Sequence, residues 1–186
     1  RGGKLSFAQA SAVGDRPDHA GGLALLWDES GHDFYRAGLF AQGMGYYFGA
    51  GLLLDGAGND RYVARRYAQG AGVHSALGIL ADLEGDDSYD GGTGAAQGMG
   101  LDLSVGLLFE AGGNDTYRAT AIAQAASTAN GLGFLLDLKG QDRFSLDHRG
   151  WGQSHSARGL PGLAFLLGSG SGDEFFLRGE RFEPDT

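Results

Sequence analysis

Short apolar segments recur along the chain at a regular interval, and most of them end in an acidic residue. Each segment is followed by a glycine-containing turn with an aspartate, and these turn aspartates are 27, 27, 28 and 27 residues apart. A repeat of this length indicates one supersecondary unit stacked on itself. The segments with their terminal residues are Leu25–Asp28, Leu52–Asp55, Ile79–Asp82, Leu107–Glu110, Phe134–Asp137 and Phe165–Gly168, and the turn aspartates are Asp33, Asp60, Asp87, Asp115 and Asp142.

The residues between the apolar segments favour strands over helices. Glycine occurs 36 times in 186 residues, and a glycine in a helix interior costs about 1 kcal/mol. Short apolar segments between Gly, Asn and Asp turns are typical of β-strands, and stacked strands lie about 4.8 Å apart. The pattern predicts an all-β fold, a parallel β-solenoid of about five to six coils. We expect one domain over residues 1–186, with an incomplete first coil at 1–21, regular coils from about 22 to 160 and a terminal coil at 161–186.

Two positions of the repeat are expected to face the interior. Strand alternation directs the aromatic residue after each turn inward, and a glutamine precedes each apolar segment on the core side. Stacking would place equivalent residues in register, so we predict an aromatic ladder and a glutamine ladder in which each amide donates to the carbonyl of the next glutamine. The ladders comprise Tyr35, Tyr62, Tyr89 and Tyr117, and Gln42, Gln69, Gln97, Gln124 and Gln153.

The middle leucine of each apolar segment is expected to face outward. Uninterrupted alternation from the glutamine to the acid gives this orientation, beside an outward strip of glycines. A continuous exposed leucine ridge is typical of an interface. A bend at the glycines would instead turn these leucines inward. The leucines concerned are Leu26, Leu53, Leu80, Leu108, Leu135 and Leu166.

Charge and composition exclude several classes of partner. The net charge of −9 argues against nucleic acid and anionic membranes, which need clustered Lys and Arg. Cysteine is absent, so the chain has no disulfide and no thiolate metal site. No apolar run approaches the roughly 20 residues of a membrane helix, so we expect no transmembrane segment.

The acidic turns are the strongest candidates for chemistry. Stacking brings carboxylates of successive coils together, and like charges so close need hydrogen bonds, screening or a cation such as Ca²⁺. The alternative is that each aspartate caps its own turn by accepting hydrogen bonds from backbone N–H groups. The candidate calcium ligands are Asp55, Asp60, Asp82, Asp87, Glu110 and Asp115.

Two of these turns carry a family resemblance. The turns at 56–60 (Gly-Ala-Gly-Asn-Asp) and 112–115 (Gly-Gly-Asn-Asp) resemble the turn of the RTX family of secreted calcium-binding β-rolls. The resemblance covers the turn motif only. It implies Ca²⁺ held between coils by aspartate and backbone carbonyl oxygens, and an exported protein located extracellularly or at the cell surface.

Catalytic constellations are absent from the sequence pattern. The five histidines occupy different repeat positions, so we expect no enzyme. The fifth coil is irregular, and its loop is a candidate ligand-binding site, with a tolerated surface insertion as the alternative. This loop contains Asp147, His148, Arg149, Trp151 and His155.

These patterns together favour a structural or assembly module. We expect self-association, into a closed oligomer or a filament, through the coil ends or the leucine ridge. The alternative is a calcium- or glycan-binding extracellular module. A carbohydrate-active β-helix enzyme is the third class, and it would need an acid and a base within reach of each other in an outer cleft.

Overall fold

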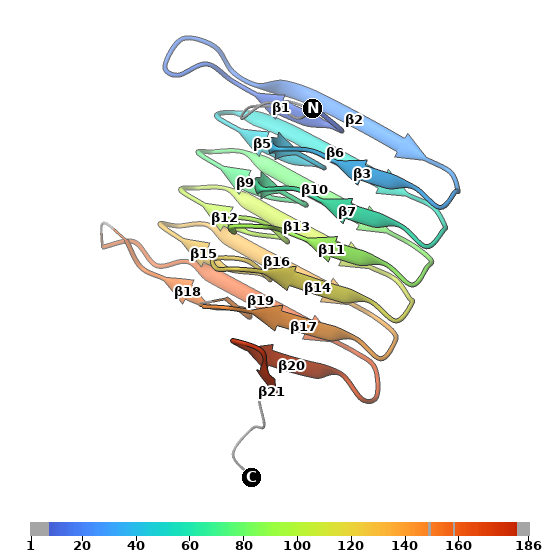
Figure 1. The fold of residues 1–186 in the computed structure, drawn as a ribbon. Helices are drawn as coiled ribbons and strands as arrows, with labels where there is room; N and C mark the ends of the chain where they lie inside the picture. The colour runs from blue at the N-terminus through green and yellow to red at the C-terminus, as the bar shows by residue number, and fades with distance from the viewer. Residues whose placement is uncertain (1–7, 149, 158, 182–186) are drawn as a thin grey trace.

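The computed structural model describes residues 8–148, 150–157 and 159–181, and their fold is a parallel β-solenoid of about six turns (Figure 1). These residues form 21 strands and no helix. The fold class predicted from the repeat is therefore confirmed. The coils stack along one direction, with the first strands at one end and β20 and β21 at the other.

The longest strands form one parallel six-stranded sheet, here called the long sheet. Its strands pair in register, so that each residue lies beside the equivalent residue of the next repeat. Every coil adds one strand to it. The strands are β2 (Gly22–Asp28), β6 (Gly49–Asp55), β10 (Leu77–Asp82), β13 (Val105–Glu110), β16 (Leu132–Asp137) and β19 (Leu163–Gly168).

A second sheet follows the acidic turns, and here it is called the opposite sheet. It contains β3 (Phe34–Arg36), β7 (Arg61–Val63), β11 (Ser88–Asp90), β14 (Thr116–Ala119), β17 (Arg143–Leu146), β20 (Glu174–Leu177) and β21 (Glu180–Arg181). β21 pairs antiparallel with β20. The last coil therefore ends in a short hairpin that covers part of the sheet edge.

Short strands complete each coil. One sheet contains β1 (Ser11–Val13), β5 (Met44–Tyr46), β9 (Gly72–Val73), β12 (Gly100–Leu101), β15 (Ser127–Thr128) and β18 (Ser154–His155). A two-stranded sheet contains β4 (Leu39–Ala41) and β8 (Arg66–Ala68). A full coil thus runs from a short strand through a long-sheet strand and an acidic turn to the opposite sheet and back.

Pairs of left-handed residues bend the chain shortly before the long-sheet strands β6, β10, β13 and β16. Before β13, Asp102 and Leu103 have φ values of 58° and 59°. Pairs at the same repeat position in other coils, such as Ala129 and Asn130, are also left-handed. Two such residues reset the alternation of side chains, so the faces of β13 cannot be counted from Gln97.

This bend corrects the predicted orientation of the leucines. Leu53, Leu80, Leu108 and Leu135 are fully buried in the core, and Leu26 and Leu166 pack against the same core as partly buried residues. The predicted outward leucine ridge is therefore wrong, and the alternative of a bend that turns the leucines inward is correct. The residues on either side of each leucine face outward instead.

The glycine strip also faces inward, where no side chain fits. A Cβ atom on Gly106 would lie 2.1 Å from the carbonyl oxygen of Met99, and one on Gly78 would lie 2.0 Å from that of Ala71. The short strands thus lie directly on the inner surface of the long sheet. This contact explains why glycine recurs at this position of the repeat.

Candidate functional site

A stack of aromatic rings runs through the interior of the solenoid. Neighbouring rings from Tyr35 to Tyr117 have centroids 4.8 to 5.0 Å apart and are within 5° of parallel. Phe144 and Phe175 continue the stack at 4.7 and 4.8 Å. The four tyrosines of the sequence pattern thus lie together, because the register stacks equivalent positions directly above one another.

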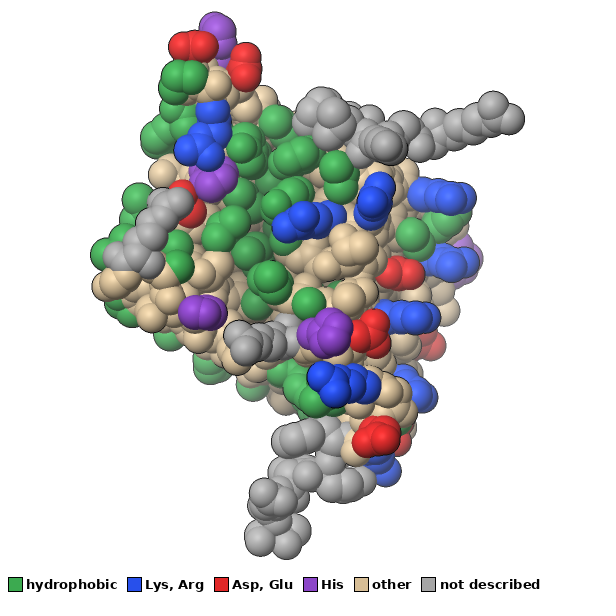
Figure 2. All heavy atoms as spheres, turned by 60° about the vertical axis from the view of Figure 1, so that its left-hand side comes forward, with side chains coloured by type: hydrophobic (Ala, Val, Ile, Leu, Met, Phe, Trp, Pro, Cys, Tyr) green, Lys and Arg blue, Asp and Glu red, His purple; other side chains and the backbone are tan. Residues whose placement is uncertain are grey.

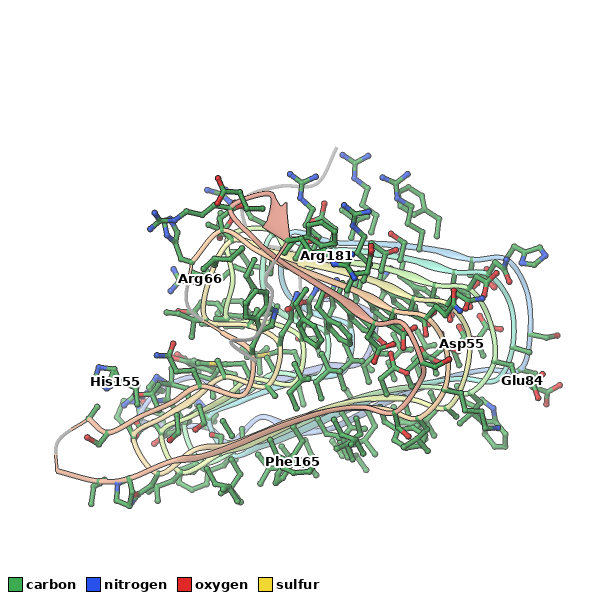
Figure 3. The ribbon with its side chains drawn as sticks, turned by 90° about the horizontal axis from the view of Figure 1, so that it is seen from below. Asp55, Arg66, Glu84, His155, Phe165 and Arg181 are labelled. Atoms are coloured by element: carbon green, nitrogen blue, oxygen red, sulfur yellow. The ribbon has the colours of Figure 1, made fainter. Side chains whose placement is uncertain are left out.

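Each interior tyrosine binds an acid at the end of a long-sheet strand. The hydroxyl of Tyr35 donates to Asp55 at 2.5 Å, and the hydroxyl of Tyr62 donates to Asp82 at 2.7 Å. Tyr89 donates to Glu110 at 2.5 Å, and Tyr117 to Asp137 at 2.7 Å. These strand-end acids lie inside the coil beside the turn, as labelled Asp55 shows in Figure 3.

The turn aspartates form a second line of acids beside the first. The backbone N–H of Asp60 donates to Oδ1 of Asp87 at 2.5 Å, and that of Asp87 donates to Oδ1 of Asp115 at 2.7 Å. Asp115 and Asp142 continue the pattern at 2.8 Å. Each carboxylate therefore caps the turn of the preceding coil, whereas the sequence suggested capping within its own turn.

The two lines form what is here called the acid column. Its members are at most 3% exposed, and they are Asp55, Asp60, Asp82, Asp87, Glu110, Asp115, Asp137 and Asp142. Within the described residues, none of them forms an ion pair with Lys, Arg or His. The column is therefore a buried concentration of carboxyl groups with no basic partner among the described residues.

One oxygen of most of these carboxylates has no hydrogen-bond partner. The unpaired buried atoms are Asp55 Oδ1, Asp60 Oδ2, Asp82 Oδ1, Asp87 Oδ2, Asp115 Oδ2, Asp137 Oδ1 and Asp142 Oδ2. Carboxylate oxygens also converge, to within 4.8 Å of one another, in three groups. The groups are Asp55, Asp60 and Asp82; Asp82, Asp87 and Glu110; and Asp115, Asp137 and Asp142.

Burial and mutual repulsion raise the pKa values of the column acids from Asp60 to Asp142. Burial, followed by the charges of neighbouring acids, raises the pKa of Asp82 to about 6 and that of Asp87 to about 7. The same causes raise the pKa of Glu110 to about 10 and that of Asp115 to about 9. The pKa of Asp137 rises to about 7, mainly because of burial. A cation bound to these carboxylates would favour their charged form.

Sequence reasoning identified six members of the column and missed two. The candidate calcium ligands predicted from the sequence end at Asp115 and do not include Asp137 and Asp142. The register nevertheless pairs Asp137 with Glu110, and Asp142 bonds the backbone of Asp115. The spacing of 27 residues was the signal that could have included them.

The interior glutamines bond to backbone carbonyls and not to one another. Gln97 is fully buried, and its Nε2 donates to the carbonyls of Tyr89 and Arg118 at 3.1 and 3.0 Å. Gln42, Gln69 and Gln124 are equally buried and donate to the carbonyls of Tyr35 and Val63, of Tyr62 and Asp90, and of Ser145, respectively. The predicted chain of amide-to-amide bonds is therefore wrong. Gln153 is exposed and does not share this interior position.

The outer surface of the long sheet is apolar throughout. Three outward positions on each of six strands form three columns, here called the outer apolar face. Phe165, labelled in Figure 3, lies on this surface. The columns are Leu23, Ala50, Leu77, Val105, Leu132 and Leu163; Leu25, Leu52, Ile79, Leu107, Phe134 and Phe165; and Trp27, Leu54, Ala81, Phe109, Leu136 and Leu167.

The opposite sheet has a different outer surface. One register column of its outward positions contains Phe34, Arg61, Ser88, Thr116, Arg143 and Glu174, five of which are charged or carry a hydroxyl group. Charged and hydroxyl side chains there are what water-exposed sheet surface ordinarily carries. The outward positions of the long sheet, which are all apolar, therefore contrast with the mainly polar outward positions of the opposite sheet.

The irregular fifth coil borders a hollow on the side of the short strands. His148, Trp151 and Gln153 line it together with Ile122 and Leu177. Figure 2 shows this side, with hydrophobic side chains gathered in the middle and Lys and Arg mainly along the right-hand margin. Asp147 and His155 are exposed nearby in the sequence, and Arg149 of the predicted loop lies outside the described residues.

Comparison with known proteins assigns no family to the chain. No family model, no curated protein and no solved structure matches it. In the described part of the chain, no helix is long and apolar enough to cross a membrane.

Proposed function

We propose that the solenoid is a structural module that associates with a second copy of itself through the outer apolar face. The observation that carries this proposal is the complete absence of polar side chains from three columns of outward positions on six strands. Leu25 and Trp27 on the edge strand β2 are 61% and 71% exposed. Large contiguous apolar patches of this kind mark interaction surfaces.

The size of the face fits an interface between two copies. Six strands at about 4.8 Å and six residues at about 3.3 Å give a footprint of about 600 Å². Two such faces would bury about 1,200 Å² in total, the lower end of the range for specific stable complexes. A contact related by a two-fold axis would extend over the whole face of each copy.

The chemistry of the face favours a second copy as the partner. The surface carries no charge that would need a complementary charge on a different protein. Two regular sheets pack face to face at about 10 Å, as in β-sandwiches, and their side chains interdigitate. A two-fold axis makes such a contact self-complementary and closed. Association through this face therefore predicts a dimer, whereas head-to-tail contact of coil ends would produce a filament.

Sedimentation velocity over a wide concentration range tests this proposal. The wild-type chain is expected to sediment as a dimer, and Leu107→Glu is expected to sediment as a monomer because its carboxylate would be buried without a partner. Thr116→Glu is the matched control, since it introduces the same charge on the opposite sheet of the same coil. This control is expected to remain dimeric. Circular dichroism would verify that both variants are folded.

Two results would overturn the proposal. The first is a wild-type chain that remains monomeric at every concentration, which would mean that another molecule or chain segment covers the face. The second is a folded Leu107→Glu variant that dimerises as well as wild type. The extracellular or cell-surface location implied by the turn resemblance stays a prediction, and cell fractionation would test it.

A further inference from the structure

The hydrogen bonds of the acid column leave one oxygen unpaired in seven of its eight carboxyl groups. At Asp82, Oδ2 accepts from Tyr62 while Oδ1 is buried and unpaired. At Asp87, Oδ1 accepts from the backbone of Asp60 while Oδ2 is buried and unpaired. The same division recurs at Asp55, Asp60, Asp115, Asp137 and Asp142. Seven carboxylates are thus held by one oxygen, with the other left available.

A buried carboxylate oxygen without a hydrogen-bond partner destabilises the folded protein. The same unpaired oxygen recurs at seven positions of the repeat, which indicates that it is a feature of the repeat and not an accident of one coil. A charged carboxylate removed from water needs a counter-ion or a proton. Within the described residues no basic side chain pairs with these acids. The charge of these carboxylates is therefore compensated by protons or by cations taken up from solution.

We propose that the acid column binds Ca²⁺ between successive coils, at each of the three groups of converging carboxylates. Three atoms within 4.8 Å of one another have a common centre no more than about 2.8 Å from each. Oxygen ligands lie 2.3–2.6 Å from Ca²⁺, so small side-chain adjustments close each group around an ion. Asp82 belongs to two groups and would bridge two ions.

The donor set favours calcium over other metals. All ligands are carboxylates, with no histidine or cysteine in any group, which disfavours zinc and copper. Mg²⁺ keeps several water molecules and demands near-ideal octahedral geometry. Ca²⁺ accepts irregular coordination and bidentate carboxylates, which suits buried groups of unequal shape.

The longer side chain of Glu110 explains why the third group of converging carboxylates differs in composition from the first two. The groups at Asp55 and Asp82 each combine a strand-end acid, the turn aspartate of the same coil and the next strand-end acid. The same combination would next be Glu110, Asp115 and Asp137, but it does not form. Glu110 has one more methylene group, and its Oε1 instead accepts from the backbone N–H of Ala111 at 3.1 Å. The third group accordingly begins at Asp115.

Terbium luminescence provides a direct test of an interior site. Tb³⁺ replaces Ca²⁺ in oxygen sites, and its emission is sensitised only by aromatic rings within a few ångströms. Tyr62, Tyr89 and Tyr117 bond directly to acids of the column. Chelator-treated, desalted protein is expected to show Tb³⁺ emission on excitation of tyrosine, and Ca²⁺ is expected to displace it. Absence of sensitised emission would overturn the proposal.

Calorimetry measures the stoichiometry and the effect on stability. Titration with Ca²⁺ is expected to give three sites, and saturation is expected to raise the unfolding midpoint by about 10 °C. Mg²⁺ is expected to give a much smaller shift. No heat and no shift at millimolar Ca²⁺ would overturn the inference.

Isosteric variants separate metal binding from a structural role. Asp82→Asn should remove two of the three sites, whereas Asp142→Asn should remove one. Asp86→Asn is the matched control, because Asp86 is exposed in the same turn and bonds Asn114. This control should keep all three sites. In chelator, Asp82→Asn is expected to melt no lower than wild type, because one buried charge is removed.

The pattern across these variants decides the result. Loss of Ca²⁺ stabilisation in Asp82→Asn, with unchanged behaviour of Asp86→Asn, supports the proposal. Equal losses in both variants would mean that Ca²⁺ acts at the surface, and this would overturn it. If Asp82→Asn does not fold, the count of sites in Asp142→Asn decides between these outcomes.

Discussion

The hydroxyl group of Tyr62 donates a 2.7 Å hydrogen bond to Oδ2 of Asp82, 20 residues later in the chain. The next coils repeat this relationship down to Tyr117 and Asp137. One step further, Phe144 replaces the tyrosine and Gly168 replaces the acid at the equivalent register positions. Donor and acceptor are lost together, which indicates that tyrosine and acid act as one unit of the repeat.

We expect Tyr62→Phe to destabilise the protein by about 1–3 kcal/mol. The substitution keeps the ring stack and leaves both oxygens of Asp82 unpaired in the interior, and such a group costs its full desolvation penalty. Urea denaturation would measure the change. Tyr47→Phe is the control, because its hydroxyl bonds the Pro17 carbonyl at an exposed site, and we expect less than about 0.5 kcal/mol there. Equal effects of the two substitutions would contradict the paired role of Tyr62.

Gly106→Ala is expected to cost about 3 kcal/mol or more. Its Cβ would lie 2.1 Å from the carbonyl oxygen of Met99, and backbone on both sides leaves no room for adjustment. Gly112→Ala provides a comparison, because its Cβ would meet only the Lys139 side chain, at 3.6 Å. We expect that second change to be within about 0.5 kcal/mol of neutral. A similar midpoint of unfolding for both variants would argue against direct contact between the short strands and the long sheet.

The fold could be predicted from the sequence because the repeat is visible in every coil. Spacing of the turn aspartates and glycine density were sufficient to indicate a parallel solenoid. The faces of the long sheet could not be predicted by alternation, because the left-handed pair Asp102 and Leu103 resets it. Neither residue is a glycine, and a single aspartate followed by leucine is too weak a turn signal to locate a bend inside an otherwise alternating segment.

The candidate site was also predictable only in part. The period placed the acids in line, but it could not show that Asp60 bonds the backbone of the preceding coil through one oxygen only. The exposure of Gln153 could not be predicted from the repeat either. Its coil gains residues before the glutamine, and the side chain is exposed where Gln97 is buried.

This contrast predicts unequal effects of the same substitution at two glutamines. Gln97→Met preserves side-chain length but removes the donor for the carbonyls of Tyr89 and Arg118. We expect a loss of about 1–3 kcal/mol in the free energy of unfolding. Gln153→Met removes an exposed amide and should change stability by less than about 0.5 kcal/mol. If thermal unfolding shows the larger loss at Gln153, the interior role of the glutamines is contradicted.

The pKa values of the acid column predict an unusual dependence of stability on pH for the protein kept in chelator. Folding raises the pKa of Asp82 to about 6, of Asp87 and Asp137 to about 7, of Asp115 to about 9 and of Glu110 to about 10. A carboxyl group whose pKa is raised by folding binds its proton more tightly in the folded state. Its contribution to stability is therefore complete below about pH 4, the pKa of the unfolded chain, and is lost as the pH rises through the folded value.

We consequently expect the stability of the metal-free protein to be highest at pH 5, lower at pH 7 and lowest at pH 9. Most proteins with paired carboxylates behave in the opposite way between pH 3 and 5, because folding lowers the pKa of their acids. Thermal unfolding in chelator at the three pH values measures the trend. Asp87→Asn removes one of the groups responsible, so its midpoint should fall less steeply between pH 5 and 9. A wild-type midpoint that rises over this interval would show that the acids are ionised and compensated within the chain.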